Sequence, residues 1–209
     1  MPTASRTEQR APRSDAVRTR AALLRGAREV FERDGFVNAK IADIAAAAGV
    51  AHGSFYSHFE GKKEALAAVL GVIEDEMLHA APKPPGEAGD PVAAIAEANR
   101  AYLDSYQRNA RLMALLEQVA TVDPDVLALR TRRADAFVKR NARLIRRLQD
   151  EGWADPELDA DLTALALSTM VSRTAYAVFA IGHRRVGLER LAGTLTRLWV
   201  NALRNQCER

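Results

Sequence analysis

Apolar residues recur along most of the chain at intervals of three and four, the spacing that places them on one face of a helix. No alternating run rich in Val, Ile and Thr is long enough to predict a strand. The pattern therefore predicts an all-α fold. Helices are expected over 15–34, 41–48, a short piece containing Phe55, Tyr56 and Phe59, then 62–80, 91–107, 109–120, 124–151, 156–181 and 187–206.

Helix-breaking residues separate these segments. Aspartate followed by proline, at Asp123-Pro124 and Asp155-Pro156, predicts a cap with proline at the first helical position. Glycine can end a helix by taking positive φ, and this is expected at Gly35, Gly49, Gly152 and Gly182. A proline-rich stretch over 82–91 predicts a loop or linker.

Charge is distributed unevenly. The net charge is +3, and residues 1–66 hold 11 basic and 8 acidic residues, so the whole excess lies in the first third. A positive N-terminal region on a neutral body suggests a polyanionic partner, although an ordinary basic tail would give the same balance. We expect a disordered basic arm at 1–14, a first domain at 15–66 and a second at 67–209.

Composition narrows the class of protein. The 209 residues are 48% hydrophobic and 27% charged, which is enough for a buried core. The single cysteine, Cys207, excludes a disulfide framework and a cysteine-based zinc site. We expect no apolar run of the roughly 18–20 residues that a membrane span needs. The N-terminal residues lack the apolar region of a signal peptide. The sequence thus predicts a cytoplasmic protein without membrane contact.

The segment from Ile41 to Phe59 reads as two short helices joined by a tight turn at Gly49-Val50. Alanines on the first helix allow the close, steep crossing of a helix-turn-helix. Exposed small or polar positions on the second helix could approach base edges in a major groove, with basic and hydroxyl-bearing neighbours on phosphates. The candidate DNA-binding residues are Lys40, Ala51, His52, Gly53, Ser54, Tyr56, Ser57, His58, Lys62 and Lys63.

Residues 19–66 resemble the DNA-binding domain of TetR-family transcriptional regulators. The order and gaps match over nearly fifty residues, in Ala27 to Phe31 before Gly35-Phe36, Asp43-Ile44-Ala45, Ala48-Gly49-Val50, Gly53 to Tyr56, His58-Phe59 and Lys62. The resemblance implies an all-helical homodimer. Its first three helices would form a helix-turn-helix domain, with the motif at about 40–59, and the remaining helices a ligand-binding and dimerisation domain.

Two positions depart from the family pattern. Lys40 opens the first helix of the motif where the family mostly has Thr or Ser, and Ala51 opens the second where Ser or Thr is usual. Lysine cannot cap a helix but can reach a phosphate as a point charge. Alanine at the second position removes a cap that contributes about 1 kcal/mol. Both departures concern phosphate contacts rather than the fold.

The last two predicted helices suggest an interface. The segment from Leu162 to Ile181 is apolar almost all round, as expected for a core helix that also meets a partner subunit. The final helix has a seam of apolar residues that could pack between subunits or within the chain. The candidate interface residues are Leu188, Leu191, Leu195, Leu198 and Trp199.

Arg173 is the only charged residue between Asp161 and Ile181. If buried it needs a partner, which could be Asp104, Glu117 or Asp135, or it could lie at an exposed edge. The alternative is that it anchors an acidic ligand. Thr169 lies on the same helix face. The candidate ligand-binding residues are Tyr102, Met113, Phe137, Met170, Arg173, Tyr176 and Phe179, although such side chains could equally be plain core.

Together these features predict a sequence-specific DNA-binding regulator, in the form of a repressor released from a near-palindromic operator by a small apolar or amphipathic effector. One alternative is an architectural DNA-binding protein without a ligand, although some 140 residues beyond the motif exceed what dimerisation needs. The other is a helical-bundle enzyme. Glu76 and His79 match half of a di-iron pattern, but no second copy exists, so no metal, cofactor or catalytic residue is expected.

Overall fold

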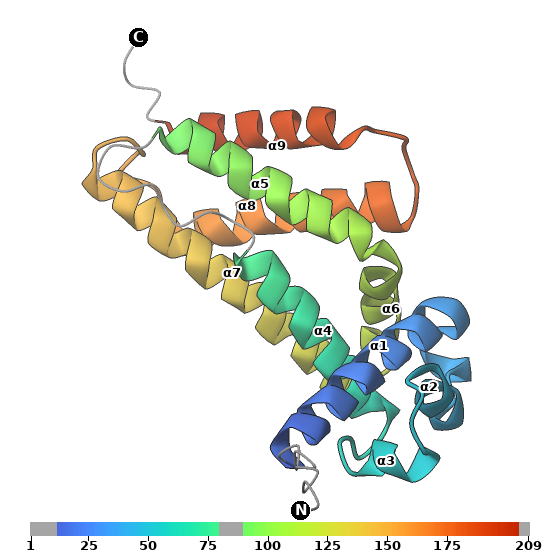
Figure 1. Cartoon of the computed structure of the whole chain (residues 1–209). Helices are drawn as coiled ribbons and strands as arrows, with labels where there is room; N and C mark the ends of the chain where they lie inside the picture. The colour runs from blue at the N-terminus through green and yellow to red at the C-terminus, as the bar shows by residue number, and fades with distance from the viewer. Residues whose placement is uncertain (1–11, 80–89, 205–209) are drawn as a thin grey trace, which may run out of the picture. The chain divides into compact units, whose positions relative to one another are not determined.

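The computed structural model describes residues 12–79 and 90–204, and the regular secondary structure in these ranges is entirely helical (Figure 1). The all-α prediction is confirmed. The chain divides into two compact units, Met1–Val69 and Leu70–Arg209. The boundary falls within α4 (Lys62–His79), so this helix belongs to both units.

The first unit contains α1 (Pro12–Asn38), α2 (Ile41–Ala47), α3 (His52–Tyr56) and the beginning of α4. Its core is built from apolar side chains of each helix, among them Leu23, Val30, Phe31, Ile44, Phe55 and Phe59. Gly35 has φ 73° and interrupts the helical geometry of α1, as the sequence predicts. Because α1 begins at Pro12, residues 12–14 are helical, contrary to the disordered arm expected there. The rest of that arm lies outside the described residues.

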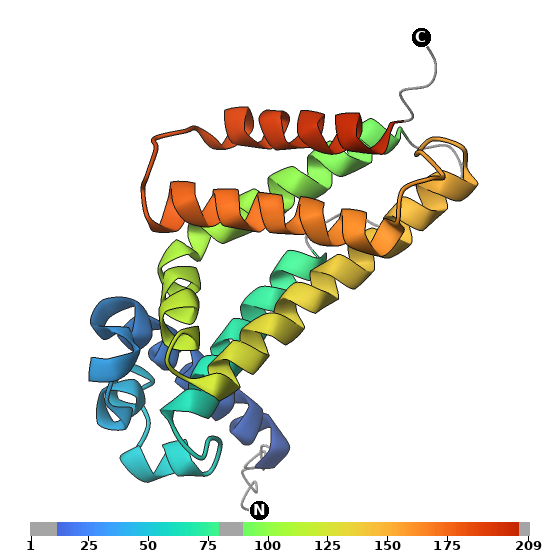
Figure 2. The same ribbon diagram turned by 180° about the vertical axis from the view of Figure 1, so that it is seen from behind.

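The described part of the second unit contains the last part of α4, five further α-helices and one π-helical turn. They are α5 (Pro91–Arg108), α6 (Ala110–Ala120), α7 (Pro124–Asp150), α8 (Ala160–Ala175), η1 (Tyr176–Ala180) and α9 (Leu188–Leu203). α5 packs against α9, α7 against α8, and α6 against both α7 and η1. α8 and α9 lie on the same side of α5 (Figures 1 and 2). The loop expected over 82–91 lies, up to residue 89, outside the described residues.

Aspartates cap three helices of the second unit, namely Asp90 before α5, Asp123 before α7 and Asp159 before α8. Asp123 accepts hydrogen bonds from the backbone N–H groups of Asp125 and Val126, confirming the predicted cap of α7. The cap predicted at Asp155 is wrong, because α8 starts at Ala160 and is capped by Asp159. The backbone N–H of Asp155 instead donates to the carbonyl of Leu203 at 2.8 Å, which holds this residue in the connection beside the end of α9.

Only one face of α8 is buried within the subunit. Ala164, Leu167 and Val171 are buried, whereas the side chains of Leu162 and Leu165 are 64% and 49% exposed. The continuous helix 160–180 is long and apolar enough to cross a membrane, whereas the sequence analysis expected no apolar run of that length. Core helices of soluble proteins can be equally long and apolar, and α8 packs along α7. The length and composition of this helix therefore do not indicate a membrane span.

Candidate functional site

Two glycines shape the helix-turn-helix, Gly49 in the turn between α2 and α3 and Gly26 at the crossing of α1 and α2. Gly49 has φ 67°, as predicted, and the N–H of Val50 then donates to the carbonyl of Ala45 at 3.0 Å. Gly26 of α1 lies directly against α2. A Cβ at this position would lie 2.7 Å from the carbonyl oxygen of Ile44, so a close helix crossing occupies the space that a side chain would need.

α3 has a buried side and an exposed side. Phe55 is fully buried and its ring lies 5.5 Å from that of Phe59, which holds α3 on the core of the first unit. Next to Phe55 on α3, His52 and Tyr56 are exposed, and their rings make an edge contact at 5.6 Å. The structure also exposes the candidate residues Ala51, Gly53 and Ser57, and it leaves Ser54 and His58 half-buried.

Two candidate positions begin helices of the motif without a side-chain cap. Lys40 precedes α2 and Ala51 precedes α3, and neither side chain makes a capping hydrogen bond. Lys40 is exposed, as is Lys63 at the beginning of α4. Their ammonium groups are thus at the surface of the first unit, where a phosphate could be reached.

Lys62 has a structural role that differs from the phosphate contact expected for it. Its Nζ donates to the carbonyl oxygens of Phe36, Val37 and Ala39 at 2.8, 2.9 and 3.3 Å, and lies 4.9 Å from the centre of the Phe36 ring. An ammonium group has three N–H donors, so these three carbonyls use all of them. The side chain joins the beginning of α4 to the end of α1.

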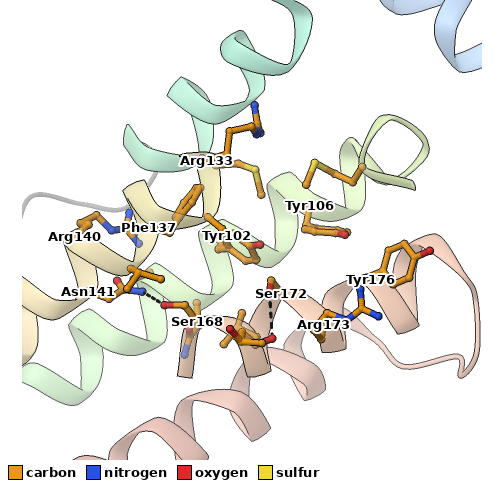
Figure 3. Close-up of a pocket in the computed structure, with 18 of the residues that line it drawn as sticks. Tyr102, Tyr106, Arg133, Phe137, Arg140, Asn141, Ser168, Ser172, Arg173 and Tyr176 are labelled. Atoms are coloured by element: carbon orange, nitrogen blue, oxygen red, sulfur yellow. Dashed lines mark hydrogen bonds between the residues drawn. The ribbon is translucent and has the colours of Figure 1, made fainter. Parts of the chain in front are cut away.

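The second unit contains a cavity of about 140 Å³ between α5, α6, α7 and α8 (Figure 3). Its walls are mainly apolar and aromatic, with a few polar groups, which is the usual character of a small-molecule site. Five of the seven candidate ligand residues line it, namely Tyr102, Met113, Phe137, Arg173 and Tyr176. The other two, Met170 and Phe179, are not among the residues that line it.

Arg173 is not buried. Its side chain is 56% exposed, its guanidinium lies 3.4 Å from the Glu117 carboxylate, and it covers the ring of Tyr176 at 4.9 Å. Glu117 also accepts a hydrogen bond from Arg130 at 2.6 Å, and this bond raises the pKa of Arg130. Of the alternatives left open by the sequence, the structure therefore shows a pair with Glu117 at an exposed edge.

The buried cation of this unit is Arg133 on α7. Its guanidinium donates to the carbonyl of Leu70 and lies 3.5 Å from the Glu74 carboxylate, both on α4. Burial lowers the pKa of Arg133, while the Glu74 carboxylate opposes that shift. Sequence reasoning missed this residue. Its signal was the spacing of Arg133, Phe137 and Arg140, which lie three or four positions apart on the inner face of α7.

Polar groups on the cavity wall come from several helices. Asn141 donates to the Ser168 hydroxyl at 2.9 Å, and Asn99 donates to that of Thr196 at 3.3 Å. Burial raises the pKa of Tyr102 far above its ordinary value, so its hydroxyl stays protonated and can donate a hydrogen bond at any physiological pH. Its ring meets that of Phe137 edge-on at 5.5 Å.

The expected seam on α9 is mostly buried within the chain itself. Leu191, Leu195 and Trp199 are between 3% and 6% exposed, and α9 packs on α5. These three residues are therefore core residues, which is the alternative that the sequence left open. Leu188 is half-buried, and Leu198, at the edge of the same apolar stripe, is 46% exposed.

The described residues thus form a helical protein with a helix-turn-helix surface in its first unit and a small-molecule cavity in its second. This combination places the protein in the class of helix-turn-helix DNA-binding proteins. Among the described residues, no group of three His, Cys, Asp or Glu side chains is placed to hold a metal ion.

Comparison with known proteins identifies the family. Residues 23–69 match the family model described as bacterial regulatory proteins, tetR family, and residues 95–204 match that of the transcriptional regulator EthR, C-terminal domain. The second match alone covers more than half of the chain. The chain belongs to the TetR family of transcriptional regulators and is a DNA-binding regulator rather than a member of an enzyme family.

Individual relatives agree with this assignment. The HTH-type transcriptional regulator TtgR of Pseudomonas putida is 29% identical over 78% of this chain and 80% of its own. The HTH-type transcriptional regulator EthR of Mycolicibacterium smegmatis is 24% identical over 97% and 96%. Among solved structures, a putative TetR-family regulator from Rhodococcus sp. superposes with a TM-score of 0.75 at 20% identity, covering 90% of this chain and 100% of that one.

A second solved structure is the fatty acid degradation regulator FadR of Bacillus halodurans. It superposes with a TM-score of 0.73 at 17% identity, covering 95% of this chain and all of that one. Likeness at this level of identity establishes a shared fold. It does not extend to the ligand.

Proposed function

We propose that this regulator represses transcription in the cytoplasm by binding a near-palindromic operator as a homodimer, and that a small molecule in the cavity of the second unit releases it. The observation that carries the proposal is the presence, in one chain, of an exposed α3 surface and a separate cavity lined by aromatic and polar side chains. A regulator that responds to a ligand needs two distinct sites of this kind.

The exposed face of α3 supports direct contact with bases. His52, Gly53, Tyr56 and Ser57 are solvent-accessible there and small or polar, so they can approach base edges in a major groove. Lys40 and Lys63 would contact phosphates from the flanking elements. Lys62 is left out of this set because its donors are already used by backbone carbonyls.

The exposed apolar residues of α8 and α9 support a homodimer. Leu162 and Leu165 on α8, and Leu198 on α9, are each at least 46% exposed. Ala202, one helical turn after Leu198 on α9, is small and exposed, which allows a second helix to approach closely. Two-fold symmetry would place the two α3 helices on half-sites about one helical turn, or a multiple of it, apart.

The cavity supports effector control. A ligand changes the affinity for DNA only by preferring one of two conformations, and coupling free energies of about 1–3 kcal/mol are typical. An architectural protein without a ligand has no need of such a cavity, so the cavity favours the regulator over that alternative.

The test has two arms. Selection of bound sequences from random DNA by the full-length protein should yield one motif with two-fold symmetry. Tyr56→Ala should then lose specific binding, while Tyr102→Ala, a change in the cavity, should retain it. Random selection without an enriched motif would contradict sequence-specific regulation, and an asymmetric single half-site would contradict the dimer.

A further inference from the structure

The walls of the cavity carry more positive than negative charge. Four arginines line it, Arg130, Arg133, Arg140 and Arg173, against one carboxylate, that of Glu117. Charged groups that are shielded from water are costly unless they are paired. An arginine that lacks a carboxylate partner in the protein is therefore the one that an anionic group of a ligand would pair with.

Three of the four arginines have a carboxylate partner. Arg130 and Arg173 share Glu117 at the edge of the cavity, where the 56% exposure of the Arg173 side chain lets solvent screen the remaining charge. Arg133 is paired with Glu74 of α4. None of these three requires an anion from a ligand.

Arg140 differs from the others. Its guanidinium donates to the carbonyl of Leu78 at 3.2 Å and lies 5.5 Å from the centre of the Phe137 ring. Within residues 12–79 and 90–204 it makes no ion pair. Burial lowers the pKa of Arg140, and the nearby Arg143 lowers it further. The side chain remains charged, with most of its five N–H donors available to a bound anion.

A second donor on the wall has no hydrogen-bond acceptor among the described residues. Trp199 is 4% exposed and lines the cavity. Its indole Nε1 is buried and makes no hydrogen bond to any described residue. Buried indole N–H groups usually find an acceptor. An oxygen of a bound molecule would supply it, independently of the charge on Arg140.

The size and walls of the cavity restrict the body of the ligand. The volume of about 140 Å³ is close to that of an engineered cavity, about 150 Å³, that binds benzene. Aromatic rings contribute to the wall, with Tyr102, Tyr106 and Phe137 grouped on α5 and α7 (Figure 3). Such walls favour a compact ring over a long flexible chain.

We propose that the effector is a compact aromatic carboxylate whose carboxylate group pairs with Arg140 and whose ring packs against Phe137 and Tyr102. This inference rests on the proposed function, because it names the ligand class of the same cavity. Guanidinium and carboxylate form two parallel hydrogen bonds, and a single negative charge balances the one cavity-lining arginine that has no carboxylate partner among the described residues. The acidic ligand that the sequence analysis gave as one alternative for Arg173 is thereby assigned to Arg140.

The test is calorimetric titration of the full-length protein with matched pairs of ligands. Benzoate and 2-naphthoate are compared with the corresponding amides, which have the same shape without the charge, and with decanoate, which has the charge without the ring. We expect at least one aromatic acid to bind with Kd below about 1 mM and at least about tenfold more tightly than its amide and than decanoate.

Variants locate the anion. Arg140→Met should weaken binding of the aromatic acid by about 30-fold or more and change binding of its amide little, because methionine retains the length of the side chain without its charge. Arg140→Lys should recover part of the loss. The matched control is Arg143→Met, an exposed arginine of the same helix that does not line the cavity and should leave Kd unchanged.

Several results would overturn the inference. They are failure of every aromatic acid to bind, equal binding of acid and amide, tighter binding of decanoate, or an unchanged Kd in Arg140→Met protein that melts at the parental temperature. Operator binding is measured separately on the same preparations. Release of DNA by a neutral or aliphatic molecule would retain the proposed function and refute this ligand class, whereas absence of operator binding would refute the proposed function alone.

Discussion

The Nζ of Lys62 lies 2.8 Å from the carbonyl oxygen of Phe36, at the point where α1 ends and α4 begins. The chain departs from helical geometry at Gly35, so the carbonyls that follow lack regular helical partners. One ammonium group satisfies several of them. A residue that looks like a phosphate contact in the sequence therefore holds together the unit that presents α3.

Lys62→Met is expected to lower the free energy of unfolding of the first unit by about 1–3 kcal/mol, because the carbonyls lose a charged donor. Urea denaturation followed by circular dichroism measures this. Lys40→Met is the control, since that exposed side chain makes no capping bond and should instead flatten the salt dependence of DNA binding by about one unit of slope. Unchanged stability with a flatter slope in Lys62→Met would assign Lys62 to phosphate.

Gly26→Ala is expected to destabilise the first unit by about 1–3 kcal/mol. The added methyl would lie 2.7 Å from the carbonyl oxygen of Ile44 and 2.9 Å from the backbone nitrogen of Ala48, so α1 and α2 must move apart. Gly71→Ala is the matched helical control, because nothing lies within 4 Å of its Cβ position. That change should stabilise α4 by up to about 1 kcal/mol. Equal melting temperatures for the two variants would contradict the close crossing.

Leu165→Asp combined with Leu198→Asp is expected to yield monomers in analytical ultracentrifugation while retaining helical content. Both side chains are nearly half exposed in the subunit, so a charge there is tolerated by the fold but costly in an interface. Leu195→Asp should instead unfold the second unit, since Leu195 is 3% exposed. Leu127→Asp, on an equally exposed leucine of α7, should leave the dimer intact. A dimer that survives the double change would place the interface elsewhere.

Arg133→Met is expected to cost about 3 kcal/mol or more of stability, because Glu74 and the Leu70 carbonyl lose a partner that is shielded from water. Arg173→Met should cost less than about 1 kcal/mol, since its pair with Glu117 is exposed to solvent. Thermal melting of both variants under identical conditions makes the comparison. The reverse order would mean that the exposed pair supports the subunit and the buried one does not.

The sequence predicts local backbone geometry best where one residue type strongly favours it. Gly35 and Gly49 were expected to take positive φ and do so, and the Asp123-Pro124 cap forms as predicted. The cap at Asp155 was misread because aspartate followed by proline also suits a turn. Its backbone bond to Leu203, a residue far away in the sequence, decides between the two.

The cavity could be predicted only in part. Apolar spacing on the helices after residue 90 indicated which side chains face inward, and most of the aromatic candidates do line the cavity. The same spacing could not tell which arginine is buried. Arg133 and Arg140 look like ordinary surface charges in a basic, helical run, and their environment depends on α4 packing against α7.

The sequence by itself determined the helices, several of their ends and the helix-turn-helix, because these depend on residues within a few positions of one another. Only the tertiary structure decided which charged side chains form ion pairs and which apolar stripes on the helices remain exposed to solvent. Segments distant in the sequence bury Leu195 and leave Leu198 exposed on the same helix. They also give Arg173 a carboxylate partner and Arg140 only a backbone carbonyl beside the same cavity. Periodicity identifies a face of a helix, and only packing determines what covers it.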